Sequence, residues 1–174
     1  FTGATHMSST FPKPAKTPPA SPLLADAGTI ERFIANCHRR KYPARAEVFH
    51  PGDPAGTLYY IISGSVSIIA RENDERELVL GYIGAGEFVG EMGLFVHTEQ
   101  RGVALRTRTP CELAEISHER LQALLAAQAN DATRLLYSIG AQISQRLLDT
   151  SRKAGRLAFL DVSDRIYRTL FDLA

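Results

Sequence analysis

The sequence predicts a mainly β domain, an antiparallel β-roll of the sandwich or barrel kind, followed by a long dimerisation helix. Short β-branched and aromatic stretches alternate with glycine and aspartate turns, which is typical of antiparallel sandwiches and barrels. After Ser117 the apolar spacing becomes helical, and it later continues for about 25 residues without a proline. The 174 residues are 44% hydrophobic and 22% charged, so the chain can form a core of ordinary size.

The N-terminal segment 1–25 is expected to lie outside the fold. Residues 1–6 are interpreted as an expression scar before Met7, and residues 8–22 are rich in Ser, Thr, Pro and Lys. Such a composition has too little apolar surface to offset the entropy lost on ordering. We therefore predict a disordered tail, with the β-rich domain and its short flanking helices over 26–130.

Turn signals divide this domain into short elements. A short helix is predicted over 26–35, and the charged segment 71–76 is the expected tip of a hairpin. Strands are predicted at 48–49, 58–62, 66–69, 78–82, 103–107 and 113–116. Leu121, Leu124 and Leu125 then predict a helix.

A longer helix is predicted over 131–158. Its apolar positions, in steps built from threes and fours, are Leu136, Ile139, Ile143, Leu147, Ala154 and Leu157. A helix this long on a small domain usually packs against a second copy, so we interpret the stripe as a dimer interface. A helix lying on its own sheet is the alternative.

The segment Phe159, Leu160 and Asp161 is predicted to be a hinge. Asp161 is a good N-cap, so a new helix is expected to begin there and to run toward residue 174. The apolar stripe of that helix needs a partner that the sequence does not supply. We interpret 159–174 as a hinge and the first helix of a further domain.

The nearly neutral charge and the cysteine count exclude several classes of function. The net charge is +1, from 20 basic and 19 acidic residues, so we expect any DNA contacts to lie outside this chain. Cys37, Cys111 and the five histidines have no metal-ligand spacing, and no nucleophile–base set can be assembled. We expect a cytoplasmic protein that is not an enzyme, without a metal, membrane span or signal peptide.

The glycine-rich segment 84–108 carries the strongest functional signal. Gly90 can let a backbone N–H approach a bound oxyanion, and Glu91 can accept hydrogen bonds from a ribose. Arg101 presents a fork of donors that suits phosphate. Together they indicate a sugar-phosphate site, although Glu91 and Arg101 could instead pair with each other. A dinucleotide fingerprint is excluded, because the spacing is GxGxxxG and no βαβ unit surrounds it.

This segment resembles the phosphate-binding cassette of the CRP/FNR family, the catabolite activator protein and its relatives. The resemblance covers about residues 26–174 and includes the stretches 59–66, 111–117 and 156–162. It implies an eight-stranded jelly-roll, a central dimer helix and a winged helix-turn-helix domain, the last of which is absent from this chain.

The resemblance also implies a set of ligand contacts. Gly90 and Glu91 match the backbone and ribose contacts, and Arg101 matches the phosphate arginine. Arg146 matches the helix arginine that closes on the site, and Thr150 and Ser151 match two hydroxyls that meet the purine, one from each subunit. The remaining expected ligand-binding positions are Ile68, Leu80, Gly81, Gly102 and Val103.

Two positions depart from the pattern of the members that bind cyclic AMP. Those members carry serine where this sequence has Gly102, directly after the phosphate arginine, and Gly81, on a wall strand. Each lost hydroxyl removes a hydrogen bond to the ligand that is worth about 1 kcal/mol of binding free energy. The loss of both is expected to weaken cyclic AMP binding by roughly ten- to a hundredfold. The glycines also enlarge the pocket, which favours a larger anion.

One branch of the family, in xanthomonads and their relatives, is associated with cyclic di-GMP, and we expect this allosteric ligand. Its second phosphate could be bound by another of the arginines that the chain offers besides Arg101: Arg106, Arg108, Arg146 or Arg152.

The most direct interpretation is a homodimeric, ligand-gated regulator that binds DNA through the missing domain, with cyclic AMP as the alternative ligand. The same β-roll also serves enzymes and channels, which a helix-turn-helix after Asp161 would exclude. A cupin-type enzyme would need clustered metal ligands, and none is seen. The resemblance assigns His38, Arg40 and Arg120 to a surface that contacts RNA polymerase; solvated charges are the alternative.

Overall fold

The computed structural model describes residues 23–72, 76–96 and 98–171, with side chains described up to residue 158. Of the predicted tail 1–25, residues 1–22 lie outside the described residues, whereas Ala25 packs against the core and donates its N–H to the Ser138 hydroxyl at 2.8 Å, so that end of the prediction is wrong. Residues 73–75, half of the expected hairpin tip 71–76, and the side chains of the predicted hinge also lie outside the described residues. The elements, in chain order, are α1 (Ala27–Ala35), β1 (His38–Tyr42), β2 (Glu47–Phe49), β3 (Thr57–Ser63), β4 (Ser65–Glu72), β5 (Arg76–Gly84), β6 (Phe88–Val89), α2 (Met92–Phe95), β7 (Ala104–Thr107), β8 (Cys111–Ser117), α3 (His118–Ala127) and α4 (Ala129–Phe171).

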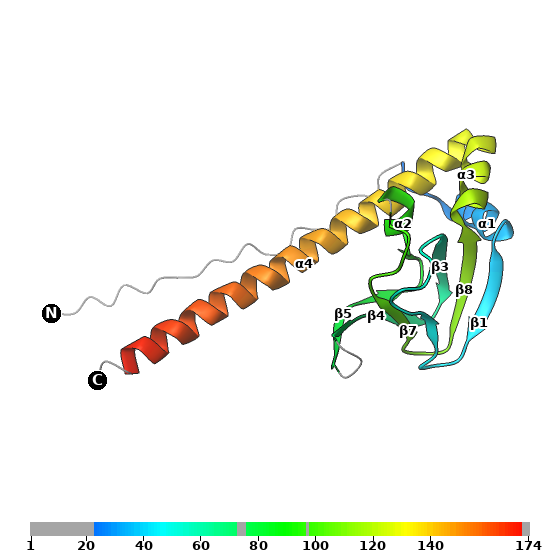
Figure 1. The fold of residues 1–174 in the computed structure, drawn as a ribbon. Helices are drawn as coiled ribbons and strands as arrows, with labels where there is room; N and C mark the ends of the chain where they lie inside the picture. The colour runs from blue at the N-terminus through cyan, green and yellow to red at the C-terminus, as the bar shows by residue number, and fades with distance from the viewer. Residues whose placement is uncertain (1–22, 73–75, 97, 172–174) are drawn as a thin grey trace.

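The strands form two four-stranded antiparallel sheets that face each other (Figure 1). Their orders are β1-β8-β3-β6 and β2-β7-β4-β5, so strands distant in sequence become neighbours. In the first sheet Tyr60 lies opposite Ala114, and in the second Ile68 lies opposite both Leu105 and Gly81. The predicted antiparallel β-roll with a long helix is confirmed.

Successive side chains of β3 point to opposite faces of the first sheet, so the core has two parts, one on each face. Tyr59 and Ile61 point between the sheets, where they pack with Leu105 and Leu113. Successive side chains of a strand point to opposite faces. Leu58 and Tyr60 therefore face the other way, toward the helices. The first sheet is thus apolar on both of its faces.

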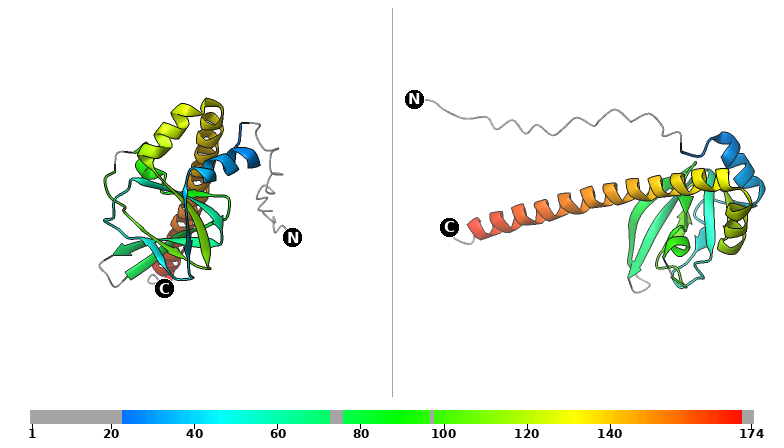
Figure 2. Two further views of the ribbon diagram at one scale, coloured as in Figure 1. Left: turned by 90° about the vertical axis from the view of Figure 1, so that its right-hand side faces the viewer. Right: turned by 90° about the horizontal axis from the view of Figure 1, so that it is seen from above.

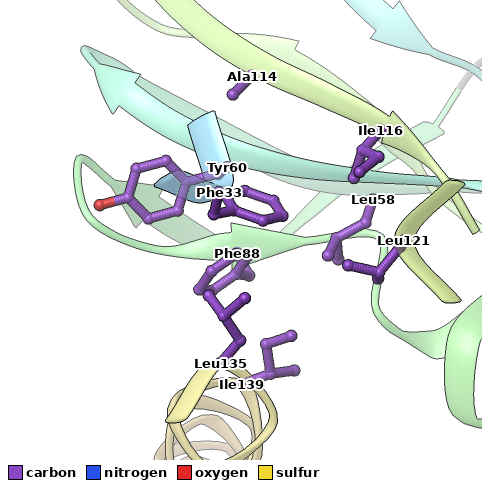
Figure 3. Close-up of a cluster of buried hydrophobic side chains, with 9 residues drawn as sticks. All are labelled: Phe33, Leu58, Tyr60, Phe88, Ala114, Ile116, Leu121, Leu135 and Ile139. Carbon is purple, nitrogen blue, oxygen red and sulfur yellow. The ribbon is translucent and has the colours of Figure 1, made fainter. Parts of the chain in front are cut away.

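The helix-side core is built around aromatic rings (Figure 3). Phe33 of α1 lies edge-on to Phe88, with ring centroids 5.5 Å apart, and Tyr60 lies 4.9 Å from Phe88. Leu135 and Ile139 close this cluster from α4. The start of α4 is therefore bound to the β-roll by apolar burial.

Polar contacts fix α1 against α4. The Asp26 side chain caps α1 by accepting from the backbone N–H of Thr29 at 2.8 Å. Arg32 binds the Asp131 carboxylate through two nitrogens at 2.6 and 2.7 Å, and these hydrogen bonds lower the pKa of Asp131. The two helices consequently present one rigid base for the sheet.

Two strands were not predicted from the sequence. β1 consists of the basic run His38–Tyr42, whose side chains are mostly exposed, and it pairs along its length with β8. A polar edge strand lacks the apolar alternation that predicts strands. β6 has only two residues, Phe88 and Val89, and is too short to show a pattern.

The predicted break at Phe159–Asp161 is wrong: α4 is continuous from Ala129 to Phe171. The segment 156–171 contains neither proline nor glycine. A single aspartate costs a helix only about 0.7 kcal/mol or less, while each further residue adds a hydrogen bond. A capping residue therefore does not by itself interrupt the helix.

The predicted dimer stripe is only partly available to a second copy. Ile139 is 2% exposed within its own core, so it cannot contact a partner. Ile143 also packs against that core. Leu147 and Leu157, by contrast, are 65% and 67% exposed. The C-terminal part of α4 extends beyond the sheets (Figure 2). The helix thus divides into a docked first part and a free second part.

Within residues 23–72, 76–96 and 98–171, no helix combines the length and apolar content needed to cross a membrane.

Phe33→Ala is expected to lower the free energy of unfolding by about 3–5 kcal/mol, because Phe33 is 1% exposed and joins α1 to the aromatic cluster. Urea unfolding followed by circular dichroism measures this. Phe95→Ala is the matched control, since Phe95 is 54% exposed, and its effect should stay within about 0.5 kcal/mol. Equal effects of the two substitutions would contradict the packing described.

Candidate ligand-binding site

A cavity of about 560 Å³ opens between the second sheet, the α2 turn and α4. This volume is in the range of sites for small molecules. The structure brings together at its wall all but one of the expected ligand residues: Ile68, Leu80, Gly81, Gly90, Glu91, Arg101, Gly102, Val103, Arg146 and Thr150. The exception is Ser151, which is exposed on α4 outside the lining.

Gly90 shapes the turn that leads from β6 into α2. Its φ is +90°, a left-handed conformation that favours glycine. A Cβ at this position would lie 2.7 Å from the Thr57 carbonyl oxygen and 2.9 Å from Arg101 Nη1. Only glycine therefore lets the Arg101 guanidinium reach the turn.

Arg101 is the buried cation of the cavity, 7% exposed. Its Nη2 donates to the Thr57 carbonyl at 2.5 Å and its Nη1 to the Gly90 carbonyl at 3.3 Å. The guanidinium lies over the Phe49 ring, 4.4 Å from the centroid, and near Tyr59 at 5.8 Å. These contacts hold the guanidinium at a fixed position.

No carboxylate of the described residues forms an ion pair with this guanidinium, although Glu91 and Asp53 lie near enough to stabilise its charge. Among the described residues, none has an oxygen within 4.0 Å of the charged nitrogens of Arg101, and the buried Nε has no hydrogen-bond partner. Burial lowers the pKa of the guanidinium below its ordinary value. A cation that is desolvated and unpaired is costly for the folded state, which favours an anionic ligand.

Glu91 pairs with α4 and not with Arg101. Its carboxylate accepts from Arg146 at 2.9 Å, and Arg146 also donates to the Phe88 carbonyl. The alternative of a Glu91–Arg101 pair is therefore wrong. Because Arg146 comes from α4, this ion pair joins the turn at Gly90 and Glu91 to the long helix.

Gln142 makes a second connection between α4 and the glycine-rich segment. Its side-chain oxygen accepts from the Phe88 N–H at 2.8 Å, and its side-chain nitrogen donates to the Gly86 carbonyl at 3.1 Å. Sequence analysis missed this residue, because a glutamine on a helix carries no distinctive signal. Its position one turn before Arg146 is the only clue that the sequence offers.

His118 contacts the turn at Gly90. The five histidines gave no functional signal in the sequence, yet Nε2 of His118 is buried without a partner and the imidazole hydrogen-bonds to the backbone of Gly90. Burial, together with the nearby Arg101 guanidinium, lowers the pKa of His118. The backbone of Gly90 is thus contacted both by the Arg101 guanidinium and by the His118 imidazole.

Several arginines considered for a second phosphate do not line the cavity. Arg106 binds Glu77 and Glu47 instead, and the pKa of Glu77 falls to about 2 because Arg106 donates to it. Arg108 lies 4.1 Å from the Tyr82 ring centroid. Arg152 is exposed, 3.6 Å from Asp149. The expectation that Arg106, Arg108 or Arg152 binds a second phosphate in this cavity is therefore wrong, because these side chains contact other groups and do not line it.

The remaining wall residues were not predicted from the sequence. They are Phe49, Ala55, Tyr82, Ile83, Val89, Met92, Gly93, Thr98, Gln100, Asp149 and Lys153. The helical repeat does contain a signal for two of them, because Asp149 and Lys153 follow Arg146 at steps of three and four and so share its face. The others depend on how the sheets and turns meet.

At Gly81 and Gly102, where the resemblance to the members that bind cyclic AMP implies serine, the cavity wall leaves unused space. A Cβ built on Gly81 or on Gly102 meets no atom within 4 Å. A serine would therefore fit at either position, and the missing hydroxyls are not a consequence of crowding. At these two positions the cavity is therefore wider than it would be with serine side chains.

His38, Arg40 and Arg120 are exposed, the first two on β1 and the third on α3. Arg120 approaches the carbonyl of Asn36 at 3.5 Å, which places it near the start of β1. Their contact with RNA polymerase stays a prediction. No group of three His, Cys, Asp or Glu side chains suited to a metal ion occurs in the described part of the chain.

Gly90→Ala is expected to lower the free energy of unfolding by about 1–3 kcal/mol, because it combines a positive φ with close contacts to Thr57 and Arg101. Urea unfolding provides the measurement. Gly102→Ala meets open space and should change the stability by less than about 0.5 kcal/mol. A neutral Gly90→Ala would show that this turn tolerates a side chain.

Comparison with known proteins gives a consistent result. The family described as cyclic nucleotide-binding domain matches residues 39–128. The CRP-like protein Clp of Xanthomonas euvesicatoria pv. vesicatoria is 71% identical over 157 residues, which cover 89% of this chain and 68% of that protein.

Two solved structures extend the comparison. A Clp structure from Xanthomonas campestris, described as a c-di-GMP responsive global regulator, matches with 71% identity and a TM-score of 0.75, over 86% of this chain and 72% of that one. The catabolite activator protein of Thermus thermophilus matches with 25% identity and a TM-score of 0.61, over 77% of this chain and 61% of that one.

Proposed function

Since this chain belongs to the family of CRP-like regulators that includes the Clp proteins of Xanthomonas, we propose that it is the sensory part of a dimeric transcription regulator whose ligand is cyclic di-GMP. The Clp protein of Xanthomonas campestris, 71% identical to this chain, is described as a global regulator. In this proposal the ligand controls DNA binding by a helix-turn-helix domain beyond α4.

The unpaired guanidinium of Arg101 carries the proposal. It is buried in the cavity, held by carbonyls and rings, and no described carboxylate lies within ion-pair distance. A phosphate can supply the missing negative charge through short, charge-assisted hydrogen bonds. Glu91 and Thr150 on the same wall offer an acceptor and a hydroxyl for the sugar and the base.

The choice of cyclic di-GMP has two supports. The Clp protein of Xanthomonas campestris, 71% identical to this chain, is described as c-di-GMP responsive. In addition, Gly81 and Gly102 lack the hydroxyls that bind cyclic AMP in other members and leave open space in the wall. Both observations favour a ligand larger than a mononucleotide.

Ligand binding can act on α4 through contacts that already join it to the cavity. Arg146 and Gln142 of α4 bind Glu91, Phe88 and Gly86 of the glycine-rich segment. A ligand that fits one arrangement of these groups better than another shifts the population of helix positions. The direction of the helix then sets the position of whatever follows residue 171.

A second copy is proposed to cover the free part of α4. On that part, positions in steps of three and four along one face are Leu147, Thr150, Ala154 and Leu157. This is the heptad spacing of a left-handed coiled coil. Leu147 and Leu157 at two of these positions are exposed in the single chain, which supports a paired helix. Ser151, outside the cavity of its own chain, lies beside this seam.

Isothermal titration calorimetry of the 174-residue chain is expected to show micromolar binding of cyclic di-GMP, with cyclic AMP at least roughly tenfold weaker. Arg101→Ala should lower the cyclic di-GMP affinity by about tenfold or more, because it removes the phosphate partner. Arg39→Ala on β1 is the matched control and should leave the affinity unchanged. Tight binding of cyclic AMP alone would contradict the ligand and favour a regulator of the catabolite activator type.

Leu147→Glu is expected to raise the dissociation constant of the dimer by more than about tenfold, because it places two unpaired carboxylates in the helix seam. Sedimentation equilibrium measures this constant. Ala123→Glu on the exposed side of α3 adds the same charge away from α4 and should have little effect. If both variants associate like the original chain, the dimer is not formed through α4.

A further inference from the structure

Three cationic side chains and two carboxylates line the cavity, and not all of the cations form ion pairs. Arg146 is bound by Glu91 at 2.9 Å. Asp149 accepts from Gln145 at 3.1 Å and lies 3.6 Å from Arg152. Two cations of the wall therefore have no carboxylate oxygen within 4.0 Å among the described residues: Arg101 and Lys153.

These two cations come from different parts of the fold. Arg101 precedes β7 and is anchored on the β-roll by Thr57 and Phe49. Lys153 stands on α4, one turn after Thr150, with an exposed side chain. The cavity therefore has one unpaired positive group on its sheet side and another on its helix side.

We propose that Lys153 forms a second phosphate subsite, which selects cyclic dinucleotides over cyclic mononucleotides. This inference rests on the proposed function, since it takes Arg101 as the site of the first phosphate. A cyclic mononucleotide has one phosphate, which Arg101 can bind alone. A cyclic dinucleotide has two phosphodiesters on opposite sides of its ring, so it needs a second cation across the cavity.

The chemistry of lysine suits this position. Its ammonium group sits on a flexible four-carbon stem and can follow a phosphate that lies some distance from the helix backbone. Asp149, one turn earlier, would repel a phosphate, but Arg152 and Gln145 partly satisfy its carboxylate. Lys153 is therefore the cationic group on the helix side of the cavity that has no ion-pair partner among the described residues.

The subsite also connects the ligand to the regulated element. Arg101 is fixed in the β-roll, whereas Lys153 moves with α4. A ligand that bridges the two pulls α4 toward the cavity, and a mononucleotide bound only at Arg101 does not. The difference between the two ligand classes thus becomes a difference in helix position.

The test compares cyclic di-GMP with cyclic GMP, which has the same base and one phosphate, by calorimetry on the 174-residue chain. Lys153→Ala should weaken cyclic di-GMP binding by about tenfold and change cyclic GMP binding by less than about twofold. Lys153→Arg keeps the charge and should retain most of the affinity for cyclic di-GMP. Lys41→Ala, an equal charge change on the exposed face of β1, is the matched control.

Salt dependence provides a readout that a purely structural role would not change. The affinity of the original chain for cyclic di-GMP should fall more steeply with salt than that of Lys153→Ala, because one charge pair has been removed. Alanine is a good helix former, so the variant is expected to fold.

Two results would overturn the inference while the proposed function stands: Lys153→Ala leaves cyclic di-GMP affinity unchanged, or it weakens both ligands equally. If the original chain does not bind cyclic di-GMP, the proposed function fails together with the inference.

Discussion

Arg101 is held inside the protein by two carbonyl oxygens and two aromatic rings, and no described carboxylate forms an ion pair with it. Many features of the structure follow from this arrangement. Gly90 has to be glycine, because a side chain would meet the guanidinium and the Thr57 carbonyl. The rings of Phe49 and Tyr59 belong to the core between the sheets, so the same residues that stabilise the β-roll also hold the cation.

The long helix joins this site to the outside of the molecule. Its first part is buried against the aromatic cluster through Leu135 and Ile139, so it cannot move independently of the β-roll. Its second part extends beyond the sheets and exposes leucines (Figure 1). Between them lie Gln142 and Arg146, which bind the glycine-rich segment. The helix is therefore anchored on one side of the cavity and free on the other.

The ion pairs around the cavity determine which charged groups remain available to a ligand. Most arginines of the second sheet are used in ion pairs with Glu47 and Glu77, which stabilise the outer face of that sheet. The Glu91–Arg146 pair serves to connect elements. What remains for a ligand is one guanidinium on the sheet side and one ammonium on the helix side. A site with this division suits an anion with two separated charges better than a compact one.

The sequence by itself determined the fold class, six of the eight strands, the helices α1 and α3, and the part of the cavity wall formed by Gly90, Glu91 and Arg101. These depend on local periodicity and on a motif whose glycine, carboxylate and arginine are fixed in spacing. Only the tertiary structure decided which charges are already paired, because Arg106 and Glu77 are distant in sequence and meet across strands. It also placed Ile139 in the core and not at a dimer seam, because a helical stripe does not reveal which surface covers it. Lys153 lines the cavity for the same reason: helical spacing puts it on the face of Arg146, but only the packing of α4 on the β-roll turns that face toward the ligand site.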